Sequence, residues 1–109
     1  WAGGGLVSTT RDLAAFMGGL ARGELFADPD SLDAMQAWTD VEPWVWYGLG
    51  AFKALLPDGR GHVWGHDGYG NAWMYYWPEQ DVLMTGTLNQ TENDWWPLVV
   101  AATEAVEGK

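Results

Sequence analysis

Apolar side chains near the start of the chain recur at spacings of three and four residues, the period of one helix face. They are Leu13, Phe16, Met17 and Leu20. Thr9 stands just before this run and is followed three residues later by Asp12, which is the spacing of a capping box with Asp in place of the usual Glu. The pattern predicts a helix over residues 10–21.

The pattern changes twice before the middle of the chain. Residues 32–38 predict a second, shorter helix, with Asp30 or Ser31 as its cap. Residues 39–43 are expected to form a loop. Residues 46–52 mix aromatic side chains with glycines and have no helical period, so they are predicted to be a strand or an extended segment.

Three strands are predicted next, over residues 62–66, 72–77 and 82–88. Residues 57–61 read Pro-Asp-Gly-Arg-Gly and form a turn before the first strand, because Pro presets one backbone angle and Gly allows positive φ. The four residues 78–81 fit a hairpin loop. The strands are apolar on both alternating faces, which indicates a sheet covered on both sides.

A last helix is predicted after Asn93 or Asp94, with Pro97 in its first turn, where the missing N–H does no harm. Its expected buried stripe is Leu98, Ala102, Ala105 and Val106. The predicted fold class is α/β (α+β): a three-stranded antiparallel meander with helices. The chain is expected to be one partial domain, with a helical stretch and loop over residues 1–45, a sheet over 46–90 and a C-terminal helix over 91–107.

Composition excludes several classes of function. The 109 residues hold 15 acidic and 5 basic side chains, a formal net charge of −10, so nucleic acid and anionic membranes are poor partners. Cysteine is absent, which removes disulfides, thiolate metal sites and cysteine nucleophiles. No targeting segment is visible. A chain that opens on Trp1 is expected to be a segment of a longer protein.

The densest group of unusual residues is Gly65 to Asn71, Gly-His-Asp-Gly-Tyr-Gly-Asn. Three glycines at a strand end leave backbone N–H and C=O groups open to a ligand. Together with Ala2 to Leu13, Tyr47 to Gly50, Pro78-Glu79 and Leu88-Asn89, this order of motifs resembles the C-terminal part of the class C β-lactamase, esterase and D-alanyl-D-alanine carboxypeptidase-like (penicillin-binding-protein-like) serine hydrolases.

The resemblance implies the C-terminal half of a β-lactamase-like sheet domain, and it implies acyl transfer to serine followed by hydrolysis of an amide, β-lactam or ester. His66-Asp67-Gly68 matches the family's Lys/His-x-Gly triplet, and Tyr69 would give one oxyanion-hole N–H. Asp67, Gly68 and Gly70 would contact substrate, although Asp67 places a carboxylate where many members have a small neutral residue. No cofactor or metal is implied. The compartment stays open, while the resemblance suggests a bacterial periplasmic, secreted or envelope-associated parent.

The family's nucleophile motif, Ser-x-x-Lys, is absent. The residue three positions after Ser8 is Arg11, and the one three positions after Ser31 is Ala34. The missing N-terminal region of the parent is therefore an expected partner, and the isolated chain is expected to be inactive. In the family the strand matching residues 82–88 pairs with a strand near the N-terminus. Without it, the chain is expected to form a homo-oligomer, either by pairing of this edge with a second copy or by exchange of a helix.

The histidines, glycines and tryptophans each raise a further possible function. His62 and His66 stand four residues apart on a strand, roughly 13 Å, which is too far to share a zinc ion. The glycines of residues 65–70 are spaced unlike a phosphate-binding loop, and no lysine is near. The nine tryptophans leave a carbohydrate-binding module, with sugars stacked on exposed indoles, as the alternative function.

Overall fold

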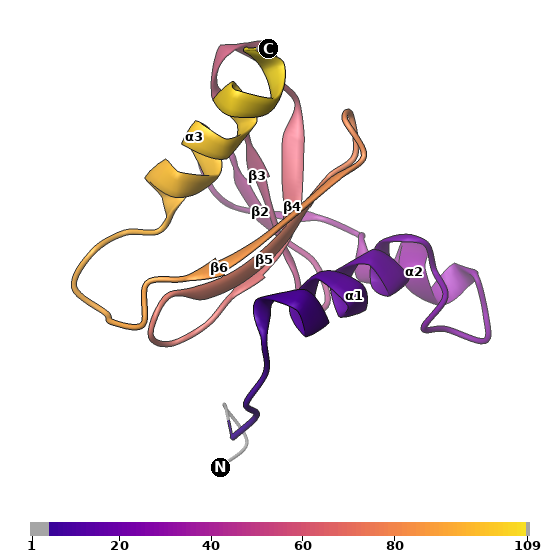
Figure 1. Cartoon of the computed structure of the whole chain (residues 1–109). Coiled ribbons are helices and arrows are strands. Elements are labelled where there is room, and N and C mark those ends of the chain that lie inside the picture. The colour runs from indigo at the N-terminus through magenta and orange to yellow at the C-terminus, as the bar shows by residue number, and fades with distance from the viewer. Residues whose placement is uncertain (1–4, 109) are drawn as a thin grey trace.

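The computed structural model describes residues 5–108 and shows an α+β arrangement (Figure 1). In this part of the chain a six-stranded antiparallel sheet is accompanied by three α-helices. The helices are α1 (Thr10–Ala21), α2 (Asp30–Met35) and α3 (Trp96–Glu107). The strands are β1 (Thr39–Glu42), β2 (Val45–Tyr47), β3 (Phe52–Leu55), β4 (His62–Asp67), β5 (Ala72–Trp77) and β6 (Val82–Thr87).

Each strand pairs with its neighbour in the sequence, so the sheet order is β1-β2-β3-β4-β5-β6. The three predicted strands are β4, β5 and β6, and their bounds differ from the prediction by at most one residue. In the register of this region His66 lies opposite Met74, and Asp67 lies opposite Trp73. The predicted meander is confirmed, but its extent was wrong, because it is the second half of a six-stranded sheet.

The first half of the sheet corrects two predictions. Residues 39–43 were expected to be loop, yet β1 occupies Thr39–Glu42, and all four of its residues are exposed. A strand with no buried face shows no apolar alternation, so its sequence carries little signal. The single extended segment over residues 46–52 is two strands, β2 and β3. They are joined by a tight connection in which the Gly48 N–H donates to the Ala51 carbonyl.

Helix α1 begins and ends as predicted. The Thr9 hydroxyl accepts a hydrogen bond from the Asp12 N–H at 3.1 Å, which is one half of the expected capping box. The helix lies against β5 and β6, and a Cβ added at Gly18 would stand 3.1 Å from the Leu83 side chain. Helix α2 is shorter than expected: it covers Asp30–Met35 and has no side-chain cap.

The sheet is covered on both faces, as its apolar pattern predicts. On one face, Met17 and Leu20 of α1 pack in a core cluster with Trp64. On the other, Val99 of α3 packs with a larger cluster of buried residues from β4, β5 and β6 (Figure 1). Those residues are Val63, Trp73, Tyr75, Trp77 and Met84.

The buried stripe of α3 was predicted in part, since Ala102 and Val106 pack against the core cluster. Val99 and Thr103 are fully buried, whereas Leu98 and Ala105 are exposed. Thr103 satisfies its hydroxyl by donating to the Val100 carbonyl at 2.7 Å, which lets a polar residue occupy the core side of the helix. Near the helix start, the Asp94 carboxylate accepts a hydrogen bond from the Trp96 N–H at 3.0 Å.

Candidate active site

The predicted site lies where β4 ends and turns into β5. Gly65 lies in β4, directly before the triplet His66-Asp67-Gly68. A Cβ at this position would come within 2.9 Å of the Tyr75 Cα and closer still to the Met74 carbonyl oxygen. Only glycine allows this approach of the two strands. Gly65 therefore brings β4 and β5 together directly before His66.

His66 is half-buried and has a polar partner at each ring nitrogen. Its Nε2 lies 3.4 Å from the Tyr47 hydroxyl, and its Nδ1 lies within hydrogen-bond reach of the Asp67 carbonyl oxygen. The Phe52 ring packs 5.0 Å from the imidazole, centroid to centroid. A carbonyl oxygen only accepts hydrogen bonds, so Nδ1 carries the proton in the neutral ring and Nε2 accepts from Tyr47.

A hollow of about 230 Å³ adjoins this imidazole. It is lined by Leu13, His66, Asp67, Gly68, Ala72, Trp73 and Met74. The indole N–H of Trp73 is buried and has no hydrogen-bond acceptor among the described residues. The Trp73 ring itself packs in the core on the α3 side, where it stacks on Trp95.

A larger groove of about 740 Å³ shares Leu13, Ala72 and Met74 with this hollow. Its other walls are the segment from Leu6 to Thr10, together with Asp12, Phe16, Gly86, Thr87 and Asn89. Leu6 and Val7 are almost fully exposed. The residues Ala2 to Gly4, which belong to the same motif, lie outside the described part of the chain.

The loop after β4 is held by its own backbone. The Gly68 N–H donates to the Ala72 carbonyl at 2.7 Å, and the Asn71 N–H donates to the Gly68 carbonyl at 3.1 Å. Gly70 has a φ of 83°, a conformation that glycine adopts without strain. Tyr69 stands at the tip with its side chain 97% exposed, and its N–H has no acceptor among the described residues.

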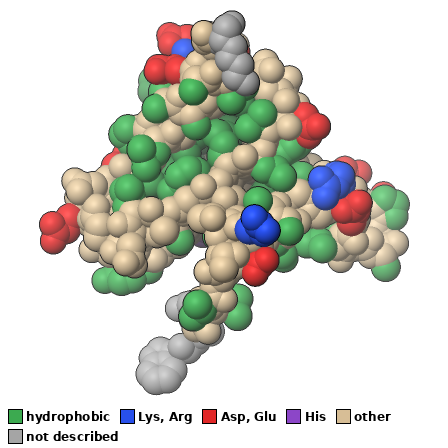
Figure 2. Space-filling view, in the orientation of Figure 1, with side chains coloured by type: hydrophobic (Ala, Val, Ile, Leu, Met, Phe, Trp, Pro, Cys, Tyr) green, Lys and Arg blue, Asp and Glu red, His purple; other side chains and the backbone are tan. Residues whose placement is uncertain are grey.

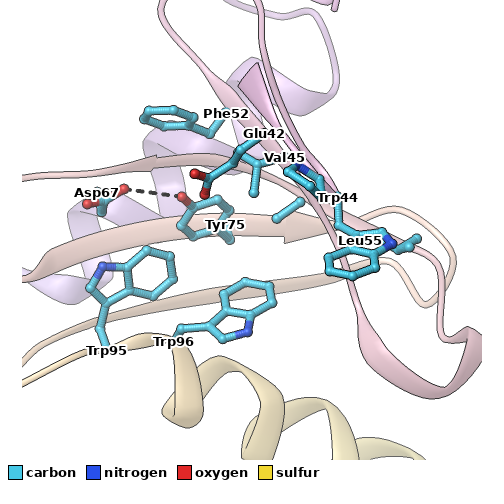
Figure 3. Close-up of a pocket in the computed structure, with 11 residues that line it drawn as sticks. Glu42, Trp44, Val45, Phe52, Leu55, Asp67, Tyr75, Trp95 and Trp96 are labelled. Carbon is cyan, nitrogen blue, oxygen red and sulfur yellow. Dashed lines mark hydrogen bonds between the residues drawn. The ribbon is translucent and has the colours of Figure 1, made fainter. Parts of the chain in front are cut away.

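The structure therefore brings together some of the predicted site residues. His66, Asp67 and Gly68 line one hollow, while Tyr69 and Gly70 lie in the adjacent loop outside its wall. Asp67 also borders a second pocket on the α3 side of the sheet, where its carboxylate accepts a hydrogen bond from the Tyr75 hydroxyl at 3.4 Å (Figure 3). Burial and the negative charge of Asp67 both raise the pKa of Tyr75 far above its usual value.

Two residues beside His66 were missed as site residues by sequence reasoning. Tyr47 was part of a recognised motif, but nothing in the sequence indicated that its hydroxyl would face a side chain 19 residues later. Leu13 belonged to the helix stripe and was predicted only as a core residue. Antiparallel pairing of β2, β3 and β4 brings Tyr47 to the imidazole. The sequence pattern predicted one extended segment where the structure has β2 and β3, so this pairing could not be foreseen.

The two serines of the chain lie outside the hollow beside His66. The Ser8 hydroxyl donates to the adjacent Thr9 carbonyl at 3.3 Å, and within residues 5–108 neither Ser8 nor Ser31 bonds a lysine or histidine side chain. No cluster of three or more potential metal ligands occurs in this part of the chain. Among the described helices, none has the length and apolar character needed to cross a membrane.

Comparison with known proteins agrees with the order of motifs. A family model described as Beta-lactamase matches residues 1–102. No curated protein and no solved structure gives a significant match. Because the model covers nearly all of the 109 residues, the chain belongs to the β-lactamase family.

Proposed function

We propose that this chain is the sheet part of a serine-acylating hydrolase, in which the end of β4 forms one wall of the active site. The observation that carries the proposal is that a half-buried His66 and the unpartnered N–H of Tyr69 occur three residues apart, at the end of β4 and in the loop after it. The chain's membership of the β-lactamase family supports it. A parent enzyme would transfer an acyl group to serine and then hydrolyse it.

Tyr69 is proposed to act through its backbone. A fixed N–H aimed at a developing oxyanion is worth a few kcal/mol, about 3, in acyl transfer. The bond from the Gly68 N–H to Ala72 holds the loop in place, so the next N–H need not reorganise during the reaction. The exposed phenol of Tyr69 has no part in this role.

His66 is proposed to contact the substrate or to relay a proton among hydroxyl groups. Its Nδ1–H bond to the Asp67 carbonyl orients the ring, and the Tyr47 hydroxyl is the adjacent group that could exchange a proton with Nε2. Asp67 directs its carboxylate to the Tyr75 hydroxyl, which supports a smaller role for its charge in substrate binding than for His66.

The nucleophile is proposed to come from a part of the protein outside this sequence, since neither serine is followed by lysine at the required spacing. The 109-residue chain alone should then hydrolyse neither nitrocefin nor p-nitrophenyl esters. Turnover above a heat-killed control, abolished by Ser8→Ala or Ser31→Ala, would overturn this part of the proposal.

The test of the site itself uses the natural protein with its Ser-x-x-Lys region joined to this chain. His66→Ala should lower kcat/KM by about a hundredfold, the usual contribution of a positioned acid or base. His62→Ala is the matched control, because His62 lies on the same strand outside the hollow, and it should leave activity unchanged. Equal effects of the two variants would contradict a role for His66.

A second pair of variants tests the backbone donor. Tyr69→Pro removes the N–H, whereas Tyr69→Ala removes the phenol and keeps the N–H. We expect a loss of about a hundredfold in kcat for the first variant and little change for the second. A large loss with Tyr69→Ala would assign the function to the side chain instead.

The carbohydrate-binding alternative has less support. Among the described tryptophans only Trp44 is exposed, while Trp64, Trp73 and Trp77 are buried. A flat sugar platform needs several exposed indoles side by side. Binding to insoluble polysaccharide, with indole fluorescence quenched by soluble sugar, would favour this alternative over the hydrolase.

A further inference from the structure

A second pocket lies on the α3 side of the sheet. Its volume is about 400 Å³, within the range of about 300–1,000 Å³ typical of small-molecule sites. Hydrophobic side chains gather around α3 on this side of the molecule, while acidic groups lie mainly toward the rim (Figure 2). Asp67 lines both this pocket and the hollow beside His66, and Phe52 of the pocket packs on the His66 ring.

Five of the eleven residues that line the pocket are aromatic. Trp95 stacks on Tyr75 with centroids 5.1 Å apart and planes at 22°, and Trp96 packs edge-on against Trp95. Phe52 and Trp44 lie on other sides (Figure 3). These rings offer π faces and edges around a space large enough for a small organic molecule.

Trp44 is the unusual member of this wall. It is 67% exposed and has a φ of 66°, a left-handed conformation that is costly for a bulky residue. The Trp44 carbonyl accepts a hydrogen bond from the Leu55 N–H at 2.9 Å, so the turn is held in this state. A large apolar ring is thus kept at the pocket mouth in spite of strain and exposure.

The charged side chains that line the pocket are all negative. Glu42 and Asp67 are its ionisable carboxyl groups, and none of its lining residues is Lys, Arg or His. The Tyr75 hydroxyl donates to Asp67 and cannot neutralise it. The net charge of −10 on the chain adds a field that attracts cations.

We propose that this pocket binds a small organic ammonium cation, with aromatic rings against its alkyl groups and Glu42 and Asp67 balancing its charge. Aromatic faces attract cations through their quadrupoles, most strongly at tryptophan. A neutral sugar or an apolar ligand would leave both carboxylates without a counter-charge. Binding of a cation here requires no serine nucleophile, although Asp67 belongs to both sites.

The test compares two probes of the same shape on the 109-residue chain. Choline carries a quaternary ammonium group, and 3,3-dimethylbutan-1-ol replaces its nitrogen by carbon and is neutral. In a proton–nitrogen correlation spectrum, choline should shift the indole signals of Trp44, Trp95 and Trp96 with a saturable curve, at constant ionic strength. The neutral alcohol should shift them at least about fivefold less at equal concentration.

Variants identify the groups responsible. Glu42→Gln with Asp67→Asn should weaken choline binding about fivefold, and Trp44→Gly should weaken it while relieving the positive φ. Asp40→Asn is the matched control, since Asp40 is exposed on the same strand as Glu42 but outside the pocket, and it should change nothing. Four results would each overturn the proposal. They are equal binding of the neutral alcohol, the same indole shifts with sodium chloride, shifts with cellobiose but not with choline, and unchanged choline binding by the double variant.

Discussion

The Tyr47 hydroxyl lies 3.4 Å from Nε2 of His66 and joins β2 to β4 at the end of the sheet. This contact and the Nδ1 contact with the Asp67 carbonyl predict a single tautomer for the neutral ring, with the proton on Nδ1. A two-bond proton–nitrogen NMR spectrum distinguishes the two tautomers directly.

Tyr47→Phe should leave that tautomer unchanged, because the Nδ1 contact remains. His62 serves as the internal comparison, since its Nδ1 lies 3.5 Å from the Glu79 carboxylate instead. An Nε2-protonated His66, in the wild-type chain or in the variant, would show that the backbone carbonyl does not control the ring.

Two adjacent glycines of α1 should respond differently to substitution. A Cβ at Gly19 would have its nearest neighbour at 3.4 Å, an ordinary contact, whereas one at Gly18 would meet Leu83 and Arg22 side chains at 3.1–3.2 Å. Gly19→Ala should therefore raise the free energy of unfolding by about 1 kcal/mol through helix propensity. Gly18→Ala should gain less, because crowding offsets part of that propensity. Urea denaturation measures both, and a larger gain at Gly18 would contradict the packing argument.

Arg60 connects the turn before β4 to the C-terminal end of α3. Its side chain is only 14% exposed and bonds Glu107 at 2.8 Å, with Glu104 at 3.9 Å. Arg60→Met, which keeps the apolar stem, should lower the free energy of unfolding by about 1 kcal/mol, since the partners are partly exposed and screened. Arg22→Met is the control, because its bond to Glu24 joins two exposed side chains. If thermal or urea unfolding showed equal losses of stability for Arg60→Met and Arg22→Met, a special role for Arg60 would be contradicted.

The raised pKa of Tyr75 should make the chain less stable at high pH. Burial and the charge of Asp67 raise its pKa in the folded state above the ordinary value of 10.0, so the folded chain keeps a proton that the unfolded chain releases. The free energy of unfolding should therefore fall as pH rises above about 10. Tyr75→Phe should make this decline shallower. Tyr69→Phe is the control at an exposed position, and an equal effect of both variants would contradict the assignment.

The outer edge of β6 predicts self-association. Within the described residues β6 pairs only with β5, and Val82–Thr87 contains no charged residue and no Pro to block a further strand. We expect a two-fold dimer in light scattering over a dilution series, with net charge limiting further growth. Thr87→Lys should shift it toward monomer, whereas Thr91→Lys, in the exposed loop that follows, should not. A monomer of 12.0 kDa at high concentration would refute the prediction.

Sequence patterns were sufficient where an element buries one face in a regular repeat. Helix α1 and strand β5 have the predicted bounds, because Thr9 caps the first and the second is a short continuous apolar run that Pro78 ends. The same reasoning failed at β1, whose residues are all exposed, and at the buried Thr103 of α3. In both cases the structure depends on pairing or hydrogen bonding that hydrophobicity does not record.

The candidate site was predictable only in part for a similar reason. His66 and Gly68 could be proposed from their motif, but the side-chain partners of His66 and Asp67 come from β2 and β5. A motif specifies neighbours along the chain, whereas these partners are set by strand register. The second pocket was not predicted at all, because its rings and carboxylates come from segments between Glu42 and Trp96.

The strictly sequential order of the strands has a consequence for the growing polypeptide. Each hairpin needs only residues close to it in the chain, so strand pairing can follow synthesis step by step. Helix α1 is different, since it packs on β5 and β6, and the Thr10 carbonyl accepts a hydrogen bond from the Thr85 hydroxyl. Helix α1 is made before the sheet, so it must wait, with Met17 and Leu20 uncovered, until β5 and β6 have been made.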